Sequence, residues 1–170
     1  MTNMKAIVKR FYMKIYGKLF LPTTLVTFLM NMSPLFIEDA SAAMIEDQQL
    51  HFGTFALVDN LTVSTLKVPY NGTNPVATNK LYPLSFGQAG NYSLSAFPAF
   101  TPLIISISDY ELKIGVSEPF TVGSFTHESI ITDVNGEAQL RLGATLSTSG
   151  TGTLYGDAVY SGNMNIVISW

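Results

Sequence analysis

The chain has 170 residues, enough for one domain with a sizeable core, and 47% of them are hydrophobic against 12% charged. Its formal net charge of −3 is unevenly distributed, because five of the nine basic residues precede Leu19 and the chain from residue 44 carries four basic and ten acidic residues. That acidity argues against nucleic acid as a partner, and the absence of cysteine excludes disulfides, thiol chemistry and cysteine–zinc sites.

The N-terminal segment has the pattern of a secretory signal peptide. Basic residues precede an apolar stretch from Leu19 to Met30, and small residues follow at Ala40-Ser41-Ala42-Ala43. We predict a helical signal peptide over residues 1–43, cleaved after Ala42 or Ala43. The alternative is an uncleaved anchor, because the apolar stretch is nearly long enough to span a bilayer, although prolines interrupt it.

The remaining residues, 44–170, are predicted to form a single β-sandwich domain. Apolar and polar residues alternate with period two, and Gly, Pro and Asn punctuate the pattern at short intervals. Nine strands are expected: residues 50–57, 61–68, 80–86, 92–97, 103–108, 110–116, 120–132, 138–147 and 163–170. This number of short strands predicts an all-β, immunoglobulin-like antiparallel sandwich.

The clearest local signal is the Asn135-Gly136 dipeptide. Asn-Gly readily adopts positive φ at both central positions of a tight turn, so residues 120–132 and 138–147 are expected to form an antiparallel hairpin. In the second of these strands Leu142 and Leu146 share one face and Arg141 lies on the other. One face is therefore predicted to be core and the other to be wet.

The chain ends on a strand whose even positions share one face, namely Met164, Ile166, Ile168 and Trp170. We expect these side chains to fill the space between two sheets. Phe52 and Phe55 are expected near the opposite edge strand.

Several short motifs together resemble one bacterial exported family. They are Leu50-His51-Phe52-Gly53-Thr54-Phe55, Leu140 to Leu146 with Leu142 and Gly143, then Tyr160-Ser161-Gly162 and the terminal alternating strand. In this order the chain resembles the family catalogued as domain of unknown function 4402. The resemblance implies a relationship to spore-coat-U-type and fimbrial pilin-like domains, an immunoglobulin-like sandwich and a role at the cell surface, without an established activity.

The likeness to pilins implies two kinds of partner, another copy of the chain and fimbrial chaperone or usher-type proteins. Pilin subunits complete their sheet with an extended segment from a neighbour, a form of β-augmentation. Residues 44–49 are polar for such a donor segment, and the disulfide common in pilin-type subunits is absent. These two features favour a sandwich that closes on its own strands.

No catalytic, cofactor or metal site is predicted. His51 and His127 are far apart in sequence and lack an evident third ligand, and His127 and Glu128 should face opposite sides of a strand. Asp133 to Glu137 is too short for a calcium loop. Asp109 and Glu111 could pair as glycosidase carboxylates, but acids are also expected beside a turn.

The sequence therefore predicts a non-enzymatic, exported surface or fimbria-like protein with a structural or adhesive role. We expect it in the periplasm, on the outer surface or in the medium, with no membrane span after signal cleavage. The alternative is a periplasmic or secreted module that binds carbohydrate or another small ligand at the surface. Its candidate stacking residues are Tyr70, Tyr82, Tyr92, Tyr110 and Tyr155.

Overall fold

The computed structural model describes residues 7–8, for the backbone alone, and residues 41–170. These residues form thirteen strands and no helix, which confirms the predicted all-β fold. The helix predicted for the signal peptide falls almost wholly outside the described residues. The strands are β1 Ile7–Val8, β2 Ala43–Gln48, β3 His51–Leu57, β4 Thr65–Val68, β5 Val76–Ala77, β6 Leu81–Gln88, β7 Gly90–Ser95, β8 Pro102–Ile107, β9 Tyr110–Leu112, β10 Phe120–Thr126, β11 Ile130–Ile131, β12 Ala138–Ser147 and β13 Asn165–Ser169.

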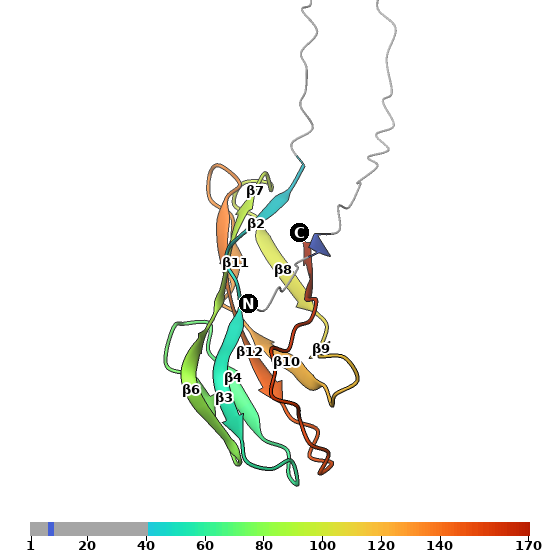
Figure 1. Cartoon of the computed structure of the whole chain (residues 1–170). Helices are drawn as coiled ribbons and strands as arrows, with labels where there is room; N and C mark the ends of the chain where they lie inside the picture. The colour runs from blue at the N-terminus through green and yellow to red at the C-terminus, as the bar shows by residue number, and fades with distance from the viewer. Residues whose placement is uncertain (1–6, 9–40) are drawn as a thin grey trace, which may run out of the picture.

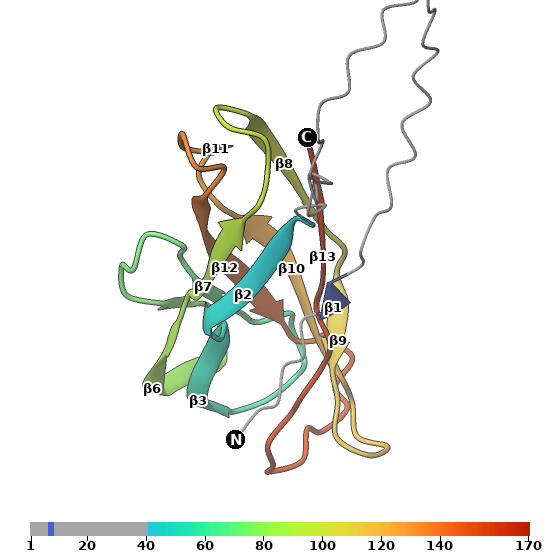
Figure 2. The same cartoon turned by 90° about the horizontal axis from the view of Figure 1, so that it is seen from above.

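The strands form two main sheets and a two-stranded ribbon (Figures 1 and 2). One sheet has the order β2-β7-β12-β10-β9, with β4 and β5 added beside the second half of β12. The other sheet has the order β1-β13-β8-β11, and β3 pairs with β6. All pairs are antiparallel except β1 with β13.

Strand β12 is the central element of the larger sheet. Its first half pairs with β7, and its second half lies between β4 and β10. Leu140, Leu142 and Leu146 on its inner face are at most 1% exposed, whereas Arg141 on the outer face is exposed. The predicted separation into a core face and a wet face is confirmed.

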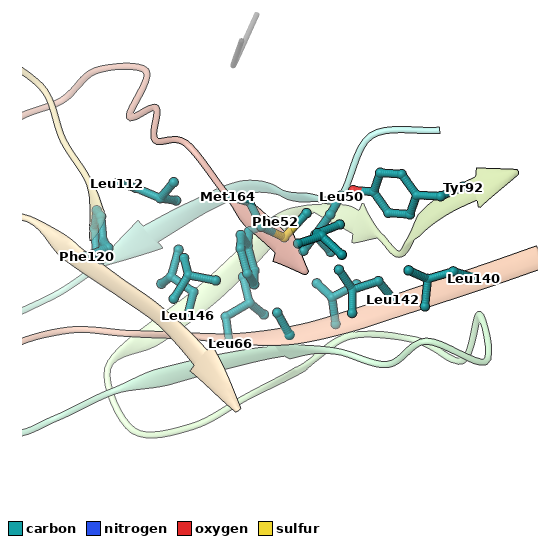
Figure 3. Packing of buried hydrophobic residues seen from close by; sticks show 14 of the residues in the cluster. Leu50, Phe52, Leu66, Tyr92, Leu112, Phe120, Leu140, Leu142, Leu146 and Met164 are labelled. Atoms are coloured by element: carbon teal, nitrogen blue, oxygen red, sulfur yellow. The ribbon is translucent and has the colours of Figure 1, made fainter. Parts of the chain in front are cut away.

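The core lies between the two main sheets and extends under β3 (Figure 3). Leucines from β12 pack with Phe52 of β3, Leu103 of β8 and Ile166 of β13 in one cluster. Burying one such side chain contributes about 1.5–3 kcal/mol, so this shared cluster is what joins the layers. Among the residues that the structure describes, no helix is long and apolar enough to cross a membrane.

The predicted strand 120–132 is wrong as a single element. It splits into β10, which pairs with β9 and β12, and β11, which pairs with β8 in the other sheet. The register shifts after Gly123, and Ser124 has a φ of 48°, so the chain bends out of the first sheet there. His127 and Glu128 consequently lie between strands rather than on opposite faces of one.

The turn at Asn135-Gly136 exists but has a different backbone from the one predicted. Gly136 has a φ of 73°, whereas Asn135 is not among the residues with positive φ. The Gly136 N–H donates to the Asp133 carbonyl at 3.1 Å, and the Asp133 N–H donates to the Glu137 carbonyl at 2.8 Å. The loop is thus longer than a two-residue hairpin, and positive φ is needed at one position only.

The sequence patterns also missed β2 and β5. Four of the six residues of β2 are exposed, so this strand lacks the apolar alternation by which a half-buried strand is recognised. β5 has only two residues and adds to β4. Both lie on the margin of the larger sheet, where backbone pairing rather than side-chain burial determines the structure.

Candidate functional site

Two of the sequence motifs, around Phe55 and around Tyr160, meet at one phenylalanine. The ring of Phe120 contacts Phe55 at a centroid distance of 5.4 Å, Tyr155 at 4.1 Å and Tyr160 at 4.8 Å. The Tyr155 pair is stacked and the other two are edge to face, both of which are favourable arrangements of aromatic rings. This aromatic cluster joins β3 to the segment that precedes β13.

A groove of about 560 Å³ runs along β3 above this cluster. Residues 51–60 line one side, residues 154–160 line the other, and Leu112, Phe120 and Leu146 form the floor. We call this feature the β3 groove. Its sides carry exposed apolar side chains: Val58 is 68% exposed, Leu154 83% and Val159 56%.

Two strands have incomplete pairing, β3 at the groove and β13 outside the groove lining. Among the described residues β3 pairs with β6 alone. β13 pairs with β8 on one side and on the other with β1, whose residues Ile7 and Val8 belong to the predicted signal peptide. Removal of that peptide would leave one side of β13 with free backbone donors and acceptors.

Residues 154–160, the second side of the groove, belong to segment 148–163, which is held mainly by side-chain hydrogen bonds and by one isolated bridge between Ser161 and Lys113. The buried amide of Asn60 donates to Ser149 Oγ at 2.9 Å and to the Thr153 carbonyl at 3.0 Å, and accepts from the Gly150 N–H at 2.9 Å. The Tyr155 hydroxyl donates to the Pro119 carbonyl at 3.1 Å. The groove therefore has a fixed shape.

Gly53 and Gly162, which belong to the short sequence motifs described above, lie where backbones approach closely. Gly53 has a φ of 73°, and a Cβ placed there would meet the Ser85 carbonyl oxygen at 2.2 Å. A Cβ on Gly162 would meet the Glu111 carbonyl oxygen at 2.3 Å. These positions serve the packing of β3 on β6 and of the C-terminal segment on β9.

The predicted terminal strand is buried in part. Met164 and Ile166 are at most 4% exposed, Ile168 is half-buried, and Trp170 is 48% exposed. Trp170 thus differs from the expectation that it fills the core. It packs edge to face on Phe97 at 5.0 Å, at the end of the sheet.

The candidate chemical groups are dispersed. His51 lines the β3 groove, its Nδ1 accepts from the Gly53 N–H at 3.1 Å, and burial lowers its pKa.

Glu111 pairs with Lys113 rather than with Asp109. The Asp133 carboxylate accepts the N–H groups of Asn135 and Glu137 and so caps the turn. Among residues 41–170 no group of three or more His, Asp or Glu could hold a metal ion.

The tyrosines proposed for sugar stacking occupy different environments. Tyr92 is fully buried, and its hydroxyl points toward Leu50 (Figure 3), so the prediction that it is exposed is wrong. Burial raises the pKa of Tyr92 well above its ordinary value. Tyr82 is 52% exposed on β6, and Tyr155 belongs to the aromatic cluster.

Sequence reasoning missed Phe120 and Asn60 as organisers of the groove. Phe120 opens an expected strand and gives no sign that it faces three other rings. Asn60 was visible as a polar residue after a strand, but its partners lie 89 to 93 residues away in the chain.

Comparison with models of protein families, with curated proteins and with solved structures found no match.

Proposed function

We propose that this protein is an exported, non-enzymatic surface or fimbria-like structural component whose β3 groove accepts an extended segment of another protein chain. The partner is a second copy of the chain or a fimbrial chaperone or usher-type protein. The single observation that carries the proposal is a groove with an apolar floor between a strand that has one neighbour and a segment that forms no strand.

The chemistry of the groove suits a polypeptide strand. An added strand brings a row of N–H and C=O groups that can pair with the backbone at the side of β3. Its alternate side chains would lie against the floor, where Leu112, Phe120 and Leu146 are already at most 5% exposed. The exposed apolar groups Val58, Leu154 and Val159 would be buried at the same time, which would remove apolar surface from water.

The predicted signal peptide supports export of the chain. Ala43 begins β2, so cleavage after Ala42 or Ala43 would leave a chain that starts with this strand. The acidic composition of the chain from residue 44 agrees with a role that excludes nucleic acid.

The test is expression of the full chain in a bacterial host, followed by intact-mass analysis and light scattering of the exported fraction. We expect a chain that lacks residues 1–42 or 1–43 and that, in contrast to the self-closed sandwich favoured by the sequence, forms species larger than a monomer that survive dilution. Val159→Asp places a charge on an exposed position of the groove and should shift the protein to monomer. Val116→Asp, at a fully exposed position outside the groove lining, is the matched control.

Two results would contradict the proposal. An intact chain that remains in the cytoplasm would exclude export. Native protein that is monomeric alone and is not captured by any chaperone of its host would exclude strand addition. Thermal melting of both variants checks that the charged substitutions leave the monomer folded.

A further inference from the structure

A second hollow, of about 250 Å³, lies on the outer face of the larger sheet and shares no lining residue with the β3 groove. Its lining includes Gln48, Tyr70, Phe86, Asn91 and Arg141. We call it the Asn91 cavity. It is bounded by polar side chains and two aromatic rings, whereas the β3 groove has an apolar floor.

Strand register places three of these polar residues in one row across three strands. Gln48 of β2 pairs with Asn91 of β7, and Asn91 pairs with Arg141 of β12. Residues directly opposite each other in antiparallel strands have Cβ atoms about 4.5–5.5 Å apart. β2, β7 and β12 lie side by side in Figures 1 and 2, so the three side chains form a continuous polar surface.

This row has hydrogen-bonding capacity that the described residues do not use. The Asn91 Oδ1 atom is buried and accepts no hydrogen bond from them. Leaving a buried acceptor unpaired costs about 1–3 kcal/mol, so it requires an explanation. The atom is closed to solvent, although Asn91 lines the cavity, so a donor of a bound molecule would satisfy it after the amide rotates toward the cavity.

Arg141 is the unpaired cation of the cavity. Lys80 and Lys113 form the two ion pairs found among residues 41–170, and Arg141 makes neither an ion pair nor a hydrogen bond within that range. Its guanidinium is planar and presents two parallel N–H groups that match a carboxylate. Gln48 is already oriented, because its Nε2 donates to the Ala89 carbonyl at 2.8 Å.

Aromatic rings border the polar row on two sides. A Cβ on Gly143 would meet the Tyr70 backbone nitrogen at 2.5 Å, so the glycine allows the Tyr70 segment to lie directly on β12 beside Arg141. Phe86 of β6 is 60% exposed at the other side. An aromatic face covers the apolar C–H surface of a sugar ring without demanding a particular hydroxyl pattern.

We propose that the Asn91 cavity binds a single carboxylated sugar ring, such as the terminal uronic acid of an acidic polysaccharide. Arg141 pairs with the carboxylate, a sugar hydroxyl donates to the Asn91 amide oxygen once that amide has rotated into the cavity, and Tyr70 and Phe86 border the ring. Sites for drug-sized molecules usually have volumes of about 300–1,000 Å³. The Asn91 cavity is just smaller than that range, so it suits a molecule of one ring. This goes beyond the proposed assembly and gives the surface protein an adhesive specificity.

Because the chain is acidic, a preference for an acidic sugar over a neutral one would identify a local cation in the site. From residue 44 onward acidic residues outnumber basic ones ten to four, so the general field of the protein repels an anion. Preference for an acidic sugar over its neutral counterpart therefore requires a local cation, because fields beyond about 8 Å are screened at physiological salt.

The experiment is calorimetric titration of the full exported protein with galacturonic acid and with galactose, which differ only at carbon 6. We expect the acid to bind about tenfold more tightly or better, as a charge-assisted pair contributes. Arg141→Gln should abolish that preference, and Asn91→Leu should weaken both sugars. Lys67→Gln, which removes an exposed cation outside the cavity lining, is the matched control and should retain it.

Binding of neither sugar by the native protein, equal binding of both, or an unchanged preference in Arg141→Gln would each overturn the proposal. Thermal melting confirms that the variants are folded. The Val159→Asp groove variant should bind galacturonic acid as the native protein does. A failure of strand addition and a failure of sugar binding are therefore separate results.

Discussion

The β3 groove and the Asn91 cavity are built from different parts of the same polypeptide. The groove is a gap in backbone pairing over an apolar floor, and its boundaries are one strand and one loop. The cavity lies over the paired strands β7 and β12 and the edge strand β2, and its character comes from side chains that project from them. A hollow of the first kind suits another backbone, and one of the second kind suits a small polar molecule. The difference also predicts which hollow can be altered without cost to the fold.

The largest expected effect is at the groove floor. Phe120 is 3% exposed and contacts three aromatic rings, so Phe120→Ala should lower the free energy of unfolding by about 3–5 kcal/mol in urea titrations. Phe86→Ala, in the Asn91 cavity, removes a ring that is 60% exposed and should change it by about 0.5 kcal/mol or less. Equal losses would mean that both hollows are parts of one core.

A pair of glycines should give the reverse order, because close approach of the backbone decides the cost at these two positions. Gly143→Ala in β12 forces a methyl group against the backbone of Val68 and Tyr70 and should cost about 1–3 kcal/mol of unfolding free energy. Gly156→Ala in the groove lining meets the Ser117 hydroxyl at 3.3 Å and the Tyr160 hydroxyl at 3.9 Å, and should be nearly neutral. Thermal and urea unfolding measure both, and a neutral Gly143→Ala would show that the Tyr70 segment is not fixed to β12.

The groove should also respond to pH through His51. Burial holds its pKa below the ordinary 6.5, so the unfolded chain takes up the proton first as the pH falls. The stability that neutral His51 contributes is therefore fully present above its pKa in the unfolded chain. It is lost as the pH falls toward its pKa in the folded protein. His51→Gln should therefore flatten the decline in melting temperature below pH 6.5, with His127→Gln as the control. An identical decline in His51→Gln would exclude His51 as its source.

The smallest expected effect is at Asn91. Because its buried Oδ1 has no partner among the described residues, Asn91→Leu should change the unfolding free energy by about 0.5 kcal/mol or less, or raise it. Asn60→Leu removes three hydrogen bonds at the groove and should cost considerably more. Comparable losses in denaturant titrations would indicate that Asn91 serves the fold rather than a ligand.

Prediction from the sequence succeeded where side-chain burial determines the structure. The alternating leucines of β12 and the terminal residues Met164 and Ile166 lie in the core as their pattern indicated. The polar strand β2 was missed because it is fixed by hydrogen bonds to β7 rather than by apolar contacts. Trp170 was expected inside but lies at the end of its strand, where the sheet no longer covers it.

Both candidate sites depend on how strands distant in the sequence align with one another. No pattern in a single sequence indicates that alignment. Arg141 was placed correctly on the outer face of β12. Its neighbour Asn91, however, is specified by the pairing of β7 with both β12 and β2. In the same way, Phe55 and Tyr160 could be recognised as motif residues, but their meeting at Phe120 required the fold.

The contact between Trp170 and Phe97 gives the chain an intrinsic optical reporter. Trp170 is the sole tryptophan of the sequence, and it sits at the end of β13 with one side against a ring and the other toward water. Its emission therefore comes from the terminal strand alone. Detachment of that strand, or the arrival of a neighbour beside it, would shift the emission wavelength and quenching without any label, so its docking can be followed in real time in the unmodified protein.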